Sequence, residues 1–187
     1  MNFSIPLNEF DRVSLNLDAQ RTELKTTDTT PQEILDFIAT EGSEFNLLEL
    51  TAGWSHDTRN KAFFPDRGLF QRFSASITLP GSDLEFYKLS YKHQYYYPIT
   101  SRTTLKFNGE LAYGDGYGDT DDLPFFEHFF AGGIRSIRGF EDNSLGPKDS
   151  TGDPFGGNAR VLGNVELLFP MPFNTEMKNI RFGAFLD

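Results

Sequence analysis

Regular alternation of apolar and polar side chains is the feature that most constrains how this chain can fold. Between positions 87 and 97 the odd residues are tyrosine, leucine or histidine, whereas the even residues are mostly lysine, serine or glutamine. The same period of two recurs over 13–19, 48–54, 69–79, 103–113, 159–167 and 181–187. Successive side chains of a strand point to opposite faces of a sheet, so the pattern predicts strands with one apolar and one polar face.

The length of these segments indicates which kind of sheet they build. They run for about ten residues, which suits a tilted transmembrane strand, whereas strands of soluble sandwiches most often have about five or six. The polar faces carry Lys, Glu and Gln at mid-strand, as a wet lumen would. We therefore expect an all-β antiparallel meander of roughly eight strands that forms the wall of a transmembrane β-barrel. A soluble β-sandwich with one wet face per sheet stays open as the alternative.

Composition excludes several classes of function. The chain has 27 acidic and 17 basic side chains, and its net charge of −10 argues against a nucleic-acid binder. It has no cysteine, and His56, His93 and His128 lie far apart without the spacing of metal ligands. No Ser/His/Asp order or phosphate-binding loop occurs. We therefore expect no metal, no cofactor and no enzymatic activity.

The first of two long connections, residues 22–44, contains the helical signal TPQEILDFIATEG. Thr30 can be the N-cap, Pro31 suits the first helical position, and Glu33 would complete a capping box. Gly42 can end the helix. This connection is predicted to be an outer loop whose short helix covers the barrel rim.

The second long connection, residues 114–157, contains the motif GGIRSIRGFED, which runs from Gly132 to Asp142. Its two ends are rich in Gly, Asp and Pro, and its middle, FFEHFFAGG, is dense in aromatic residues. A long loop with an apolar centre is expected to fold back onto the protein rather than extend into solvent.

If this loop folds into the lumen, its arginines need carboxylate or carbonyl partners. The alternation places Glu166 and Asp187 on the polar faces of two strands that are expected to be neighbours. A guanidinium fork between these carboxylates would pin the loop with charge-assisted hydrogen bonds. The alternative, that Arg135 and Arg138 are solvated loop charges, stays open on these residues alone.

The four residues Ile137, Arg138, Gly139 and Phe140 carry a family resemblance. With FFEHFFAGG before it and EDNSLGPKD after it, IRGF resembles the Val/Ile-Arg-Gly-Phe/Tyr motif of the outer-membrane barrel-assembly and two-partner-secretion superfamily. Blocks such as DRGLFQRFSASITLPGSDLEFYKLSYKHQYYYPI and GGNARVLGNVELLFPMPF extend the resemblance, in order, over most of the chain. Within the motif, Gly139 is expected to allow a close approach or a positive φ, and Phe140 to wedge the loop tip against the wall.

The resemblance implies a barrel of about sixteen strands whose sixth outer loop folds into the lumen. Residues 1–187 would be about half of it, a partial C-terminal surface-antigen-type domain. The motif arginine, here Arg138, would contact Glu166 and Asp187. The implied function is folding and inserting other barrel proteins in the bacterial outer membrane. The implied partners are the lipid bilayer, unfolded outer-membrane clients and accessory assembly lipoproteins.

Two further expectations follow from the resemblance. A transporter that secretes one partner protein also carries the motif, and the extended blocks favour the assembly factor over it. The preceding periplasmic repeats and the last strands of a complete member are missing, so the chain is expected to be a fragment that stops inside a strand at Asp187. Its open edges and apolar outer face are expected to make the isolated fragment self-associate.

Overall fold

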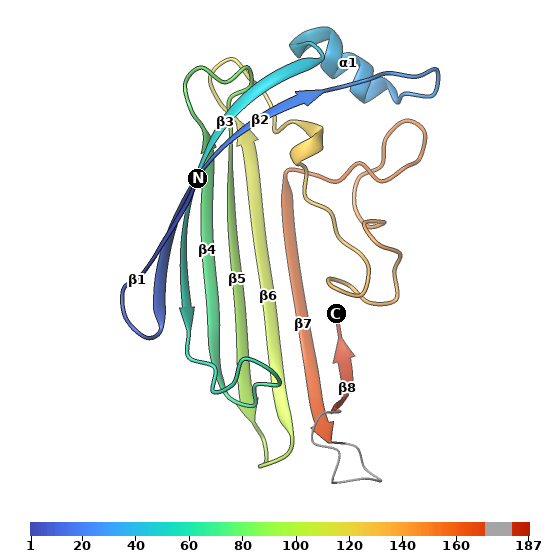
Figure 1. Cartoon of the computed structure of the whole chain (residues 1–187). Coiled ribbons are helices and arrows are strands. Elements are labelled where there is room, and N and C mark those ends of the chain that lie inside the picture. The colour runs from blue at the N-terminus through green and yellow to red at the C-terminus, as the bar shows by residue number, and fades with distance from the viewer. Residues whose placement is uncertain (171–180) are drawn as a thin grey trace.

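The computed structural model describes residues 1–170 and 181–187, which form one eight-stranded antiparallel sheet with its strands in chain order (Figure 1). The all-β meander and the number of strands are confirmed. Within the described part of the chain, no helix is both long and apolar enough to cross a membrane. The elements are β1 (Asn2–Pro6), β2 (Asp11–Glu23), α1 (Gln32–Glu41), β3 (Glu44–Asp57), β4 (Gly68–Thr78), β5 (Phe86–Pro98), β6 (Thr104–Gly116), the short 3₁₀ helix η1 (Phe125–Glu127), β7 (Ala159–Pro170) and β8 (Arg181–Leu186).

The alternation assigns the two faces of the sheet as expected. Phe73, Leu89, Tyr95 and Leu111 lie on the outer face and remain exposed. The described strands belong to a single sheet, so no second sheet covers this face within residues 1–170 and 181–187. The sandwich alternative is therefore wrong, because it required that these aromatic and aliphatic side chains be buried between two sheets.

The inner face carries charged side chains that pair across neighbouring strands. Lys92 Nζ of β5 donates to Glu110 Oε1 of β6 at 2.5 Å, and the two residues face each other in the register. Lys106 Nζ of β6 donates to Glu166 Oε1 of β7 at 3.1 Å in the same way. Pairing with an opposite charge on the neighbouring strand compensates each charged side chain for the water that it loses at the lumen wall.

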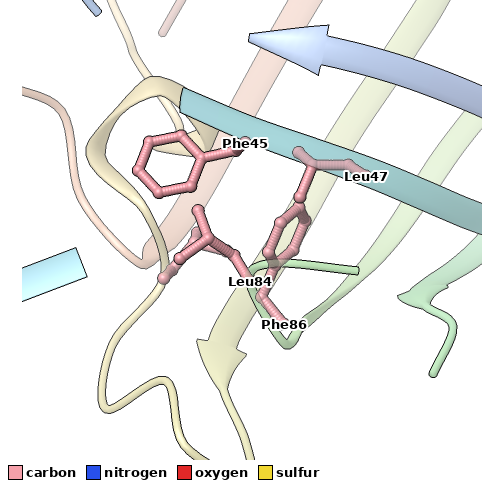
Figure 2. Packing of buried hydrophobic residues seen from close by; sticks show 5 residues of the cluster. Phe45, Leu47, Leu84 and Phe86 are labelled. Atoms are coloured by element: carbon pink, nitrogen blue, oxygen red, sulfur yellow. The ribbon is translucent and has the colours of Figure 1, made fainter. Parts of the chain in front are cut away.

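The inner face is apolar near the rim that carries the long loops. Phe45, Leu47, Leu84, Phe86 and Leu123 form a buried cluster there, and Figure 2 shows the four side chains of β3, β5 and the connection before β5 pointing toward one another. The expectation of a wet inner face is wrong at this rim. The two long loops cover the strand ends here, so burial of apolar inward residues becomes favourable.

Helix α1 packs against this cluster through Phe37. The helix ends where the sequence predicted, but its N-cap is not the predicted residue. Gly42 follows the helix with φ of 95°, a conformation that suits glycine. Thr30 is not the N-cap: its hydroxyl accepts a bond from the Thr27 N–H, and the cap position falls on Pro31 without a side-chain bond. Proline cannot supply a capping oxygen, so the first turn needs a partner from elsewhere.

Ser150 of the second long loop supplies that partner. Its Oγ accepts from the Gln32 N–H at 3.0 Å and donates to Glu33 Oε2 at 2.8 Å. The Ser150 N–H also donates to Glu33 Oε2 at 3.1 Å. Glu33 therefore bonds to a distant loop instead of completing a local capping box. The two long loops are thereby joined above the apolar cluster.

We expect Ser150→Ala to loosen this junction in a way that the titration of Glu33 reports. The Glu33 pKa is held below its ordinary value first by the residue's own backbone N–H and then by Ser150. A lowered folded-state pKa stabilises the junction above the ordinary pKa of the carboxyl, and this contribution is lost as pH falls through the lowered value. Ser150→Ala should raise the Glu33 pKa in an NMR titration. Ser101→Ala, in a turn at the opposite rim, is the control, and an unmoved Glu33 pKa in Ser150→Ala would refute the junction.

Strands β1 and β8 are the two edges of the sheet as described. Along its outer side, each has backbone N–H and C=O groups that pair with no other described strand. Every residue of β1 is exposed, and the outer face carries exposed apolar side chains. Unpaired edges and apolar surface favour association. We expect residues 1–187 alone to sediment as oligomers in detergent-free buffer. A stable monomer in that experiment would contradict the prediction.

Candidate functional site: the arginine motif of the second long loop

The second long loop, residues 117–158, contacts the inner face of the sheet at several places. Lys88 Nζ of β5 donates to Glu127 Oε2 of η1 at 2.5 Å. Arg160 of β7 donates from Nη1 to the Phe130 carbonyl at 3.0 Å. In Figure 1 the loop descends beside β7 toward the C-terminus. The loop therefore lies against the wall along much of its length.

Arg138 lies at the centre of the loop's charged contacts. Its Nε and Nη2 donate to the two carboxylate oxygens of Asp187 at 2.8 and 2.5 Å, and its backbone N–H donates to Asp187 Oδ2 at 2.8 Å. Its Nη2 also lies 3.3 Å from Glu166 Oε1. The Asp187 side chain is only 4% exposed, so this bidentate pair is well shielded from water. The structure thus brings Arg138, Glu166 and Asp187 together.

Phe185 adds a contact that the sequence analysis did not name. The guanidinium carbon of Arg138 lies 3.7 Å from the centre of the Phe185 ring. A guanidinium over an aromatic face is favourable, and more so where water is reduced. The period of two could have identified this residue, because Phe185 shares the inner face of β8 with Arg181 and Asp187.

The other motif residues differ in how they lie. Gly139 has φ of 91°, and an added Cβ would meet nothing within 4 Å, so its role is the positive φ and not a close approach. The Phe140 side chain is 54% exposed, so the prediction that it wedges against the wall is wrong for the strands described. Arg135 is exposed and has no ion pair within the described residues. Ile137 is half-buried.

Asn164 of β7 also belongs to the site. It is 7% exposed, and its Nδ2 donates to Asp187 Oδ1 at 2.9 Å and to the Ser136 carbonyl at 2.8 Å. The period of two over 159–167 puts Asn164 on the same face as Glu166, but nothing in the sequence gives it a role. Within residues 1–170 and 181–187, no group of three or more acidic or histidine side chains could hold a metal ion. The ionic and amide contacts of Arg138, Asp187 and Asn164 fasten the loop to the wall.

We expect Asp187→Asn to loosen the loop more than Glu166→Gln. Asp187 accepts three bonds from Arg138, whereas Glu166 divides its Oε1 between Lys106 and Arg138. Hydrogen bonds to charged groups contribute about 1.5–3 kcal/mol each, and both changes keep the side-chain shape. Trypsin cleavage within the loop of the full-length protein measures the difference. Equal cleavage rates for the two variants would contradict this ranking.

Comparison with known proteins agrees with the fold and the family resemblance. The model of the Omp85 superfamily domain matches residues 1–187. The chain is 35% identical to the outer membrane protein assembly factor BamA of Neisseria meningitidis serogroup B, over 100% of this chain and 25% of that protein. It is 28% identical to the protein of the same name from Nitratidesulfovibrio vulgaris, over 90% of this chain and 21% of that protein.

A solved structure supports the same conclusion. The crystal structure of BamA from Haemophilus ducreyi lacking POTRA domains 1–3 superimposes with a TM-score of 0.90 at 27% sequence identity, covering 98% of this chain and 39% of that one. The chain spans about a quarter of the length of the curated relatives that it matches. The sequence-based assignments to this barrel family and to the bacterial outer membrane are confirmed. The chain belongs to the Omp85 superfamily.

Proposed function

We propose that this chain is the part of an outer-membrane protein assembly factor that holds the motif loop against the lumen wall, and that the fastened loop is required for inserting client barrels. The observation that carries the proposal is the contact of Arg138 with both Asp187 and Glu166, in a chain 35% identical to a BamA. The clients, the accessory lipoproteins and the lack of a catalysed reaction are parts of this proposal.

A fastened loop stiffens the part of the barrel wall that it touches. Client strands are expected to join an assembly barrel by pairing with an open strand edge, so the barrel must open locally without losing the rest of its wall. The loop spans β5, β7 and the residue after β8 through Lys88, Arg160 and Asp187. Fastening a loop across several strands keeps this part of the wall together while another part opens.

The test uses the purified full-length protein in liposomes and a urea-unfolded outer-membrane barrel as the client. The appearance of protease-resistant folded client over time is compared with empty liposomes. We expect faster folding with the protein present. If folding is not accelerated but an unfolded soluble polypeptide enters the liposomes, the chain serves a secretion transporter and the proposal is wrong.

A further inference from the structure

Three side-chain amides cross the inner face of the sheet in one row and end at the motif loop. Gln94 of β5 faces Asn108 of β6, and Asn108 faces Asn164 of β7. Gln94 Nε2 donates to Asn108 Oδ1 at 3.1 Å, and Asn108 Nδ2 donates to Asn164 Oδ1 at 2.7 Å. We call this row the amide ladder.

The ladder leaves the last amide with a defined orientation. A primary amide has two N–H donors and one carbonyl acceptor, and which end points where is decided by its partners. Asn164 accepts from Asn108, so both of its N–H groups point away from β6. One reaches the Ser136 carbonyl in the loop and the other reaches Asp187 Oδ1. No donor of the Asn164 amide is left unused.

The neighbouring groups explain why amides suit this row. A cavity of about 370 Å³ between the loop and the wall is lined by the ladder and by charged residues, among them Lys92, Lys106, Glu110 and Glu166. A charged side chain in the row would compete for Arg138 or for its carboxylates. A neutral amide can hold Asp187 by one hydrogen bond without altering the balance of charge.

We infer that the amide ladder Gln94–Asn108–Asn164 is a positioning device that sets the direction of Asp187 and the seat of the loop, so that Arg138 meets a carboxylate already aimed at it. The inference rests on the proposed function, since it explains how the loop is held in place. Asn164 is the positioning residue that touches the loop, and Asn108 and Gln94 act through it.

The test variant is Asn108→Asp in the full-length protein, which keeps the side-chain shape and removes the donor to Asn164. The new carboxylate would face the Asn164 oxygen, and the amide would have to rotate and turn its oxygen toward Asp187. We expect the population of released loop to rise about tenfold, the effect of losing one hydrogen bond to a charged group. Asn16→Asp, on the inner face of β2, is the matched amide-to-acid control and should change nothing.

Loop release can be read with a nitroxide on a cysteine placed at Arg135, which is exposed and has no ion pair within the described residues. The chain has no cysteine of its own. The mobile fraction of the spectrum should rise in Asn108→Asp and, to a smaller extent, in Gln94→Glu. If Asn108→Asp does not fold, Gln94→Glu decides the question alone, and an unchanged spectrum in it overturns the inference.

A double-mutant cycle separates positioning from general support of the wall. In the background of Arg138→Ala, Asn108→Asp should add less to loop mobility than in the wild type, because the Arg138–Asp187 contact that it helps to aim is gone and only the bond from Asn164 to the Ser136 carbonyl remains to be lost. An equal added effect in both backgrounds would mean that Asn108 only stabilises the sheet, and the inference would fail. Client folding distinguishes the two proposals: if Arg138→Ala inserts clients normally, the proposed function fails, whereas a silent Asn108→Asp with an impaired Arg138→Ala defeats the ladder alone.

Discussion

Replacing Arg138 with alanine in the full-length protein is expected to release the motif loop and to slow client insertion by about tenfold or more. The substitution removes a bidentate bond to Asp187, a second ionic contact to Glu166 and the stacking on Phe185. It also leaves the 4% exposed Asp187 carboxylate without its cation. An uncompensated shielded charge is costly, so the pocket is expected to open to water.

Two variants make this result interpretable. Arg138→Lys keeps the charge but cannot form the planar fork, and its insertion rate should lie between those of the wild type and Arg138→Ala. Arg135→Ala removes an exposed arginine from the same loop and should behave as wild type. Chymotrypsin cleavage of the loop, whose aromatic sites such as Phe140 are the same in all three variants, and folding of a client in liposomes are measured on the same preparations. Normal values of both in Arg138→Ala would show that the loop does not need this arginine.

The second large effect is expected from Phe45→Ala in the apolar cluster under the long loops. Phe45 is 1% exposed and touches the rings of Phe37 in α1 and Phe126 in η1. Truncation of a buried phenylalanine costs about 3–5 kcal/mol through lost burial and the cavity left behind. The cost should fall on the junction of the two loops with β3, because the cluster is where these segments meet.

Hydrogen exchange localises that effect. Amides of α1 and of residues 123–129 should exchange faster in Phe45→Ala, whereas the middle of β5 and β6 should keep its protection. Phe63→Ala is the matched control, because the Phe63 side chain is 85% exposed and belongs to no cluster. Uniform loss of protection over the whole sheet would show that the cluster supports the barrel wall and not the loop junction.

The period of two predicted the faces of the strands because it follows directly from strand geometry. The inward positions of Glu166, Asn164 and Asp187 could therefore be predicted. Their contact with Arg138 could not be predicted from alternation, because only the family resemblance implied that the loop folds inward. The same rule assigned Lys88, Lys92 and Glu110 to the lumen. The assignment of these side chains to the inner face depends only on alternation and on which strands are neighbours.

The remaining features depend on contacts that no local pattern encodes. Ser150 caps α1 from 118 positions away, and the helical signal around Thr30 is the same with or without it. The apolar cluster draws residues from β3, β5 and two connections, and each of them alone resembles an ordinary loop or strand end. Phe140 was expected to wedge the loop tip against the wall, and the structure leaves it 54% exposed.

The most direct measurement of the central claim is a double-mutant cycle between Arg138 and Asp187, read as the rate of client folding in liposomes. If the fork fastens the loop and the fastened loop serves insertion, Arg138→Ala and Asp187→Ala should each slow client folding, and the double variant should be no slower than the worse single one. Single variants whose effects multiply in the double variant would show that the two residues act independently, and the account would be contradicted.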